Sequence, residues 1–169
     1  MMSWWELVRP MGKKVSVLFV CLGNICRSPT AHGVFQAKVL EQGLAGDIQI
    51  DSAGTAAYHV GNPPDSRSAK AAKRRGYDLS SLRARQAVTA DFAQFDYILA
   101  MDTQNLRDLQ AISPTNYQGR LCLFLDYAGM SSADVPDPYY DGEAGFEHVL
   151  DLVESASDGL LQHIKKELS

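Results

Sequence analysis

Cysteine, excess positive charge and long apolar segments are all scarce in this 169-residue chain. Three cysteines, an odd number, do not suggest the disulfide framework of a secreted domain. The net charge of −4 disfavours a nucleic-acid binder, because such proteins usually carry a basic stripe. No run of about 18 apolar residues exists to span a membrane, and residues 1–10 lack the basic start and apolar core of a signal peptide. These absences predict a protein of the reducing cytoplasm, with neither nucleic acid nor a membrane as its partner.

Two further absences narrow the chemistry. The sequence Gly-Lys-Ser/Thr of a nucleotide-binding Walker loop does not occur. No cluster of His and Asp ligands is apparent, so neither a metal nor another cofactor is predicted. The length suits one domain, 46% of the residues are hydrophobic as in a globular protein, and no internal repeat is present.

The most informative stretch runs from Val15 to Ala31, where an apolar, β-branched run is followed by a short loop and the start of a helix. This helix is expected to begin at Ser28, with Pro29 in its first turn, where a missing N–H does no harm. Such a strand, loop and helix start form an anion cradle, because loop N–H groups point inward and the helix N-terminus adds partial positive charge. Cys21 stands at the mouth of this cradle, which favours its thiolate form at neutral pH.

Arg27 lies at the far end of the same loop. Its guanidinium offers paired donors that fit two oxygens of a tetrahedral oxyanion, and it does not lose its charge. The loop can therefore wrap a phosphate while the sulfur faces phosphorus, and its candidate phosphate-binding residues are Leu22, Gly23, Asn24, Ile25, Cys26 and Arg27. The hydroxyl of Ser28 can reach back to steady the thiolate and help it leave in a second step. The competing interpretation is a buried structural cysteine beside a solvated arginine. It is disfavoured because strand, loop, arginine, serine and proline all occur in register.

The second informative stretch is the Pro-rich segment 134–141, where a proline on each side of Asp137 fixes the backbone. Phosphoryl transfer to sulfur leaves an alkoxide or phenoxide, which a positioned acid must protonate. Asp137 is the candidate acid, and Tyr139 and Tyr140 are expected to line a cleft and stack on an aromatic ring. The alternative is an acidic turn in which Asp137 is merely solvated.

Hydrophobic patterns predict strands at 15–20, 47–51, 97–101 and 120–124. Helices are predicted at 28–42, from 65 to 76, from 102 through 109 and at 146–168, with a short one near 89–92. Strands that alternate with helices imply an α/β fold, a doubly wound four-stranded parallel sheet with helices on both faces. The loop after the first strand then lies at the carboxyl ends of the strands, where such sheets bind ligands. Cys122, inside the fourth strand, is expected to be an inert core residue.

Residues Cys21 to Pro29, Cys-Leu-Gly-Asn-Ile-Cys-Arg-Ser-Pro, resemble the signature of the low molecular weight protein tyrosine phosphatases, and the resemblance extends over residues from about 13 to 168. It implies a Rossmann-like fold of the phosphotyrosine phosphatase I type and metal-independent hydrolysis of protein phosphotyrosine and aryl phosphates. In that scheme Cys21 is the nucleophile, Arg27 clamps the phosphate, and Asp137 gives a proton to the leaving group and then takes one from water. Residues 1–12 are an N-terminal extension to this pattern, and residues 13–169 form a single phosphatase domain.

The resemblance also assigns supporting roles. Ser52 matches a serine that hydrogen-bonds the loop asparagine, here Asn24, whose place beside Gly23 suits a left-handed backbone. Tyr58 matches an aromatic wall of the substrate cleft. His59 falls where eukaryotic members often carry Asn, and its role is open between a cleft residue and a loop histidine without duty.

Arg67 matches an arginine that braces the phosphate loop and is paired with Asp65, although Asp65 alone could be an ordinary helix N-cap. A family segment that often reads His-x-Ala-Arg-Gln has Leu82 at the histidine position, so no histidine-mediated role is expected there. Arg83 and Arg85 in this segment are interpreted as a solvated face.

Ile25 and Cys26 bear on specificity and regulation. Relatives that resemble protein-arginine phosphatases carry Thr where Ile25 stands, so Ile25, as part of the substrate cleft, favours an aryl phosphate. Cys26 matches the second loop cysteine of the family. It could form a reversible disulfide with Cys21 under peroxide, or be a packed thiol. Asp102 matches an acidic residue that caps the helix after the third strand, and is interpreted as structural.

Two rival functions remain besides the arginine phosphatase. Thioredoxin-coupled arsenate reductases share the loop and fold, but they need further cysteines after the second helix, and residues 76–92 contain none. A non-catalytic phosphoprotein-binding module would be expected to have lost Cys21 or Asp137. The expected partner is a tyrosine-phosphorylated protein, of which a bacterial tyrosine kinase is one candidate, with phosphate or another oxyanion in the site.

Overall fold

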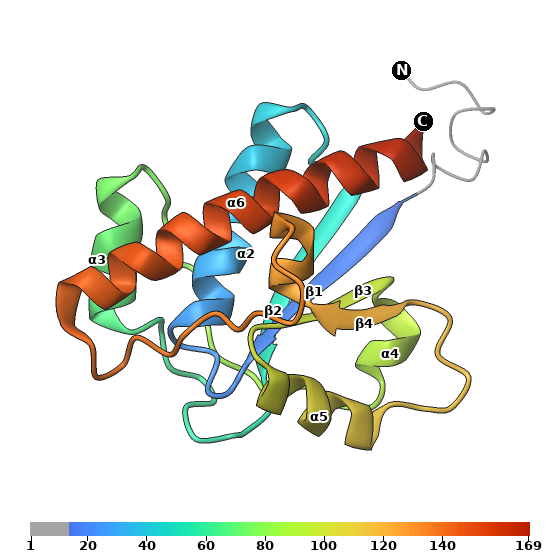
Figure 1. Ribbon diagram of the computed structural model, residues 1–169, viewed down its shortest axis with the longest axis horizontal. Helices are drawn as coiled ribbons and strands as arrows, with labels where there is room; N and C mark the ends of the chain where they lie inside the picture. Colours follow the sequence, from blue (N-terminus) through green and yellow to red (C-terminus); the bar gives the residue numbers. More distant parts are fainter. Residues whose placement is uncertain (1–13) are drawn as a thin grey trace.

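The computed structural model describes residues 14–169, so the extension predicted at 1–12 lies outside the described residues. One parallel sheet with strand order β2-β1-β3-β4 forms its centre (Figure 1). The strands are β1 (Val15–Cys21), β2 (Ile48–Gly54), β3 (Tyr97–Ala100) and β4 (Arg120–Leu123). The predicted α/β fold with a four-stranded parallel sheet is thus confirmed.

Strand β1 lies in the interior of the sheet because both of its faces are apolar. All seven of its residues are buried, and alternate side chains enter two separate hydrophobic clusters. Val17 and Phe19 pack on one side of the sheet, and Leu18 and Val20 pack on the other. A continuous apolar run of this kind is what a strand covered on both faces requires.

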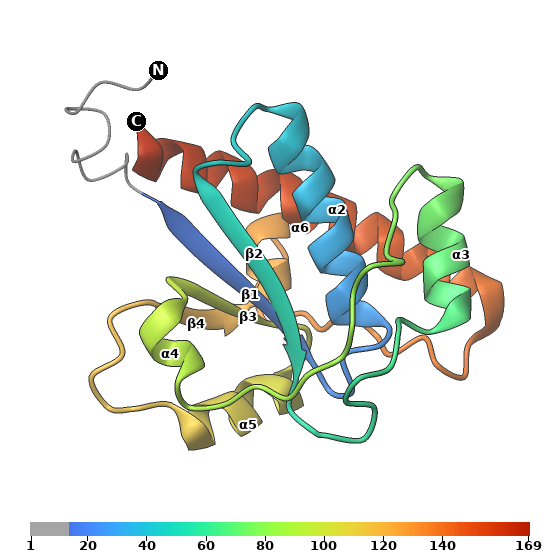
Figure 2. The ribbon, with the colours of Figure 1, turned by 180° about the vertical axis from the view of Figure 1, so that it is seen from behind.

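Helices cover both faces of the sheet (Figures 1 and 2). One face carries α2 (Arg27–Glu41), the 3-10 helix η1 (Phe124–Ala128) and the long α6 (Gly142–Leu168). The other carries α4 (Asp91–Gln94) and α5 (Thr103–Ile112), and α3 (Ser66–Arg74) packs beside α2 and α6. None of the described helices combines the length and the apolar character needed to cross a membrane.

The end of β2 and the start of α6 lie more than two residues from the predicted boundaries. Strand β2 continues beyond Asp51 to Gly54, because Ser52, Ala53 and Gly54 pair in register with the last three residues of β1. Helix α6 begins at Gly142 rather than Phe146. The structure offers no local cap that would have marked this start in the sequence.

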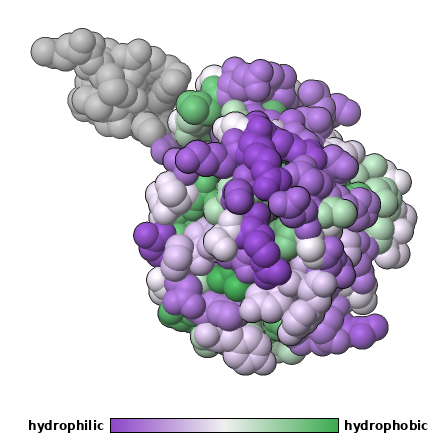
Figure 3. All heavy atoms as spheres, turned by 90° about the vertical axis from the view of Figure 1, so that its left-hand side faces the viewer, coloured by the Kyte–Doolittle hydropathy of each residue, from purple (hydrophilic) through white to green (hydrophobic). Residues whose placement is uncertain are grey.

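Helix α6 is tied to its neighbours by close backbone contact and by ion pairs. A Cβ placed at Gly159 would lie 1.7 Å from the carbonyl oxygen of Tyr127, so only glycine permits η1 to approach this closely. Near the other end of α6, Arg75 forms ion pairs with acidic residues of α6, among them Glu147 and Glu154. Figure 3 views this side of the molecule, and much of the surface there is hydrophilic.

Candidate active site

The loop after β1 curls around the sulfur of Cys21. Asn24 has a φ of 58°, the left-handed conformation that the Gly-Asn pair predicts, and its N–H donates to Cys21 Sγ at 3.3 Å. Within residues 14–169, the main-chain N–H groups of Gly23, Ile25, Cys26 and Arg27 have no acceptor in the protein. These N–H groups and the N-terminus of α2 are therefore available to an oxyanion.

Gly54 allows the loop to lie against the end of β2. A Cβ at this position would lie 2.7 Å from the carbonyl oxygen of Leu22 and 3.1 Å from the carbonyl carbon of Gly23. The main chain continues the contact, because Thr55 N–H donates to Cys21 and Ala56 N–H donates to Leu22. The anion cradle therefore packs against the carboxyl end of β2.

Ser28 is completely buried beside the thiol. Its Oγ lies 3.0 Å from Cys21 Sγ and accepts a hydrogen bond from Asn24 Nδ2 at 2.8 Å. A thiolate can only accept, so the Ser28 hydroxyl is the donor when the sulfur is ionised. The Asn24 amide occupies an acceptor position of Ser28, so the hydroxyl hydrogen points away from Asn24, toward the sulfur or toward the Ala53 carbonyl oxygen at 3.3 Å.

Arg27 is buried behind the loop and held by two partners outside it. Its Nη1 donates to Asp102 Oδ2 at 2.6 Å and to the carbonyl oxygen of Val135 at 3.1 Å. Burial alone lowers the pKa of Arg27, but the Cys21 sulfur and the Asp102 carboxylate outweigh it and shift the pKa upward. Arg27 is thus a fixed cation whose Nε and Nη2 have no hydrogen-bond acceptor among residues 14–169.

Asp137 faces this cation across a cleft. Its Oδ2 lies 3.8 Å from Arg27 Nη2, its side chain is half exposed, and its Oδ1 accepts from the Tyr139 N–H at 3.1 Å. The cleft has a volume of about 290 Å³. It is lined by Cys21, Leu22, Gly23, Ile25, Cys26, Arg27, Tyr58, His59, Asp137, Tyr139 and Tyr140. A carboxylate, a thiol and a cation therefore meet at one place that an aryl phosphate can enter.

Aromatic rings form the rim of the cleft. Tyr139 and Tyr140 pack edge to face with ring centroids 5.0 Å apart, and Tyr58 contacts His59 in the same way at 6.5 Å. Tyr140 is 92% exposed and Tyr58 is 76% exposed, so both rings stand at the mouth rather than in a core. The His59 ring lies over Gly23, where a Cβ would meet it at 2.8 Å.

Two of the expected supports differ from prediction. Ser52 does not hold Asn24: its Oγ lies 3.2 Å from Nδ1 of the buried His32, so the predicted contact is wrong. Asn24 instead has Ser28 and the main chain of Arg85 as partners. The sequence could not show that Ser52 is bonded elsewhere, because its partner His32 comes from α2, another element of the fold. Burial lowers the pKa of this histidine.

Arg67 braces the Asp137 loop more directly than the phosphate loop. It forms the predicted pair with Asp65 through Nε and Nη2, at 3.1 Å and 2.9 Å, and its Nη1 donates to the Tyr139 carbonyl at 2.7 Å. The link to the phosphate loop is the N–H of Asp65, which donates to the Ile25 carbonyl. Asp65 also caps α3, so it serves both of the roles that were open.

Two contacts of the site were missed. Asp102 caps α5 as predicted, but it also pairs with Arg27. Arg85, interpreted as solvated, forms ion pairs with Asp51 and Asp91 and bonds Asn24 through its main chain. Both contacts join segments that are far apart in the chain. The only sign of them in the sequence was a charged residue in a loop.

The second loop thiol differs sharply from the first in its surroundings. Burial raises the pKa of Cys26 to about 12, against the opposing effect of a hydrogen bond with Ser68. Cys26 is therefore a neutral thiol at pH 7. Cys122 is only half-buried on the edge strand β4, with a weak contact to Tyr127, rather than fully in the core. Within residues 14–169, no group of three or more His, Cys, Asp or Glu side chains is placed to hold a metal ion.

The parallel sheet and the cradle after β1 define the class of phosphatases that bind phosphate in a cysteine-containing loop. The family model for low molecular weight phosphotyrosine protein phosphatase matches residues 16–169, so the chain belongs to that family. It is a low molecular weight protein-tyrosine-phosphatase.

Three relatives illustrate the match. The chain is 43% identical over 154 residues to YfkJ of Bacillus subtilis, a low molecular weight protein-tyrosine-phosphatase, covering 90% of this chain and 97% of that one. The crystal structure of a protein tyrosine phosphatase from Entamoeba histolytica with Hepes in the active site is 40% identical, covers 91% and 99% of the two chains and has a TM-score of 0.86. Vibrio vulnificus Wzb in complex with benzylphosphonate is 30% identical, covers 88% and 98%, and has a TM-score of 0.78.

Proposed function

We propose that this phosphatase hydrolyses protein phosphotyrosine and aryl phosphates without a metal, through a cysteinyl-phosphate intermediate on Cys21. One observation carries the proposal. The Cys21 sulfur lies 3.0 Å from the Ser28 hydroxyl inside a loop in which four N–H groups, those of Gly23, Ile25, Cys26 and Arg27, have no acceptor among the described residues, with the fixed cation Arg27 behind it. That arrangement stabilises a thiolate and the equatorial oxygens of a phosphoryl group together.

In the first step the Cys21 thiolate attacks phosphorus opposite the aryl oxygen. The sulfur–phosphorus bond forms as the bond from phosphorus to the aryl oxygen breaks. Arg27 and the loop N–H groups stabilise the charge on the equatorial oxygens. Asp137, across the cleft, gives its proton to the leaving phenolate.

In the second step Asp137, now a carboxylate, takes a proton from water as that water attacks phosphorus. The sulfur–phosphorus bond breaks, inorganic phosphate forms, and the electron pair returns to Cys21. The Ser28 hydroxyl, oriented by Asn24, donates to the emerging thiolate and makes it a better leaving group.

Three tyrosines and Ile25 favour an aromatic substrate. Tyr58, Tyr139 and Tyr140 wall the cleft, and offset or edge contacts with a substrate ring would contribute about 0.5–1.5 kcal/mol each. The benzylphosphonate bound by the Vibrio relative carries an aromatic ring. A Drosophila arginine phosphatase, 33% identical, is also among the solved relatives, so the preference rests on the cleft residues rather than on the family.

Further proposals rest on the resemblance and on Cys26. Residues 13–169 act as one catalytic domain in the cytoplasm, on tyrosine-phosphorylated proteins such as a bacterial tyrosine kinase. Cys26, adjacent to Arg27 and lining the same cleft as Cys21, forms a reversible disulfide with Cys21 under peroxide and protects it from over-oxidation.

The test is hydrolysis of p-nitrophenyl phosphate with a chelator present, for wild type, Cys21→Ser and Asp137→Ala, with Cys122→Ser as the control. Turnover should resist the chelator, be abolished by Cys21→Ser, fall about a hundredfold or more with Asp137→Ala, and be unchanged in the control. A wild type that binds phosphate without turnover would instead be a phosphate-reading module.

A matched pair of peptides tests the substrate class. A peptide with phosphotyrosine should be hydrolysed faster than the same peptide with phosphoarginine, and Ile25→Thr should narrow the difference. Faster hydrolysis of the phosphoarginine peptide by the wild type would contradict the aromatic preference.

A further inference from the structure

We propose that Arg85 is a positioning residue for the catalytic loop, that it acts through Asn24, and that the buried carboxylate of Asp91 anchors it. The inference deepens the proposed mechanism and rests on it, because Asn24 matters only if Cys21 and Ser28 carry the chemistry.

The link begins at the side chain of Asn24. Its Oδ1 accepts the main-chain N–H of Arg85 at 3.0 Å, and its Nδ2 donates to Ser28 at 2.8 Å. Within residues 14–169 these two residues are the only hydrogen-bond partners of the Asn24 amide. Asn24 is 3% exposed, so water cannot readily replace a lost partner. The Arg85 N–H therefore fixes which way the amide faces, and a reversed amide would turn an oxygen toward Ser28 that competes with Cys21, and with the Ala53 carbonyl at 3.3 Å, for the hydroxyl hydrogen.

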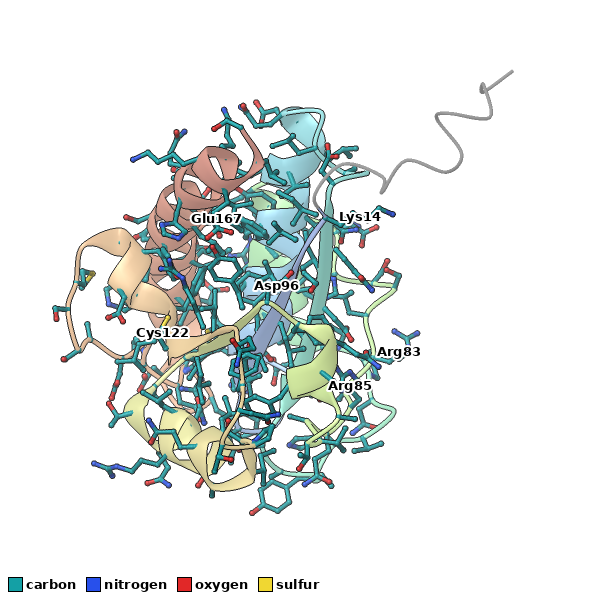
Figure 4. All side chains as sticks on the ribbon, turned by 90° about the vertical axis from the view of Figure 1, so that its right-hand side faces the viewer. Lys14, Arg83, Arg85, Asp96, Cys122 and Glu167 are labelled. Atoms are coloured by element: carbon teal, nitrogen blue, oxygen red, sulfur yellow. The ribbon has the colours of Figure 1, made fainter. Side chains whose placement is uncertain are left out.

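The guanidinium of Arg85 fastens this N–H to two other parts of the fold. Nη1 and Nη2 donate to the two oxygens of Asp91 at 3.1 Å and 3.0 Å, and Nε donates to Asp51 at 3.0 Å. Asp91 opens α4 and is 5% exposed, and Asp51 lies in β2. Figure 4 shows Arg85 beside α4 and Arg83 at the outer edge of the molecule. A paired carboxylate that is buried this deeply holds its partner in one geometry.

The neighbouring carboxylates keep the Arg85 guanidinium charged. Burial alone lowers the pKa of Arg85, but the hydrogen bonds and charges of Asp91 and Asp51 outweigh it and raise the pKa overall. Asp91 is fixed in turn by the N–H of Val88, which donates to it at 2.8 Å. Leu82, whose side chain cannot hydrogen-bond, stands three residues before Arg85, and the bond that this segment makes to Asn24 comes from the main chain of Arg85.

The alternative is that Arg85 only stabilises the fold and does not influence the catalytic loop. The main chain of this segment also pairs with β2, since Gly54 N–H donates to the Arg85 carbonyl and Ala87 N–H donates to Gly54. If those bonds alone set the position of the N–H, the guanidinium would matter to stability and not to the thiol. The test must therefore report on the thiol itself.

The variants are Arg85→Gln, Arg85→Lys and Asp91→Asn, with Arg83→Gln as the matched control. Arg83 is exposed and, among the residues that the structure describes, its side chain donates only to the carbonyls of Ser80 and Leu82. Two rates are measured: kcat on p-nitrophenyl phosphate, and inactivation by iodoacetamide that added phosphate prevents. We expect Arg85→Gln and Asp91→Asn to lower both by about tenfold, less than the hundredfold that a 1 Å misplacement can cost. The control should leave both unchanged.

A double-mutant cycle with Asn24→Ala distinguishes positioning from plain stability. If Arg85 acts through Asn24, Arg85→Gln should lower kcat no further once Asn24 is alanine, although its effect on Tm should persist. All assays are run well below each variant's Tm, and Arg85→Lys replaces Arg85→Gln if the latter does not fold. Wild-type rates in folded Arg85 and Asp91 variants, or an undiminished effect of Arg85→Gln in the Asn24→Ala background, would overturn the inference. A wild type without turnover would overturn the proposed function instead, so the two failures are distinct.

Discussion

Gly54→Ala is the substitution that most directly tests whether the sheet edge shapes the phosphate loop. The new Cβ would lie 2.7 Å from the Leu22 carbonyl oxygen, and ordinary contact begins at 3.4 Å, so the two must part by about 0.7 Å. Gly54 itself cannot retreat, because its N–H and carbonyl are bonded to Arg85 and Ala87. The displacement therefore falls on the loop between Cys21 and Arg27.

The expected loss of activity is larger than the loss of stability. Overpacking of this size costs about 1–3 kcal/mol in the free energy of unfolding. A shift approaching 1 Å in the loop lowers kcat/KM by roughly 10- to 100-fold, because N–H groups that converge on one phosphoryl group lose their common focus. The inhibition constant of inorganic phosphate should rise in parallel, since phosphate uses the same N–H groups.

The control for this prediction is Gly46→Ala. A Cβ at Gly46 has nothing within 4 Å, so kcat/KM and phosphate inhibition should be unchanged and stability should stay within about 0.5 kcal/mol. Urea unfolding and p-nitrophenyl phosphate kinetics measure both quantities on the same preparations. If Gly54→Ala showed wild-type kcat/KM and phosphate inhibition, the reasoning that Gly54 shapes the loop would be refuted.

Three further predictions concern Arg27, the α6 contact and Cys26. Asp102→Asn removes the charge that fixes Arg27. It should lower kcat about tenfold or more, since a hydrogen bond to a charged group is worth about 1.5–3 kcal/mol. Unaltered kcat and phosphate inhibition would contradict this prediction. Gly159→Ala places a Cβ 1.7 Å from the Tyr127 carbonyl oxygen, so the free energy of unfolding measured in urea should fall by about 3 kcal/mol. The variant should keep its kcat below its Tm. A smaller loss of unfolding free energy than that of Gly54→Ala would contradict this prediction. Burial raises the pKa of Cys26 from 9.0 to about 12, so the folded protein keeps this proton to a higher pH than the unfolded chain does. The contribution of the thiol to the free energy of unfolding is therefore complete below pH 9 and is lost as the pH rises to 12. Cys26→Ala should flatten the decline of the unfolding free energy over that window by up to about 1.4 kcal/mol per pH unit, measured by urea titration at each pH, and an unchanged slope would count against it.

Features that depend on neighbours in the chain could be predicted from the sequence. Asn24 in a left-handed conformation, the start of α2 within one residue of Ser28 and the approach of the Ser28 hydroxyl to the sulfur all follow from a few consecutive residues. The parallel sheet follows for a similar reason, since an apolar run of the length of β1 is stable only between two layers.

Contacts between distant segments could not be predicted. Asp102 and Arg27 are 75 positions apart, and Arg85 and Asn24 are 61 positions apart, so nothing local marks either pair. The Ser52 prediction was wrong for the same reason, because His32 reaches its hydroxyl from another element. A serine, an arginine or an aspartate in a loop has several possible partners, and only the packing of the sheet and helices selects one.

The pattern of these long-range contacts supports the proposal that one loop holds both a thiolate and a phosphoryl group. Arg27 is held by Asp102 after β3 and by the Val135 carbonyl in the Asp137 loop, while Asn24 is held by Arg85. The partners are parts of the protein itself, so the donors are oriented by the fold and little of the binding energy of a phosphoryl group is needed to order them. The same design makes kcat sensitive to residues that never touch the substrate. Substitutions at Asp102 and Arg85 should therefore change kcat far more than they change the affinity for the aromatic part of the substrate, which we propose rests on Tyr58 and Tyr140 at the mouth of the cleft.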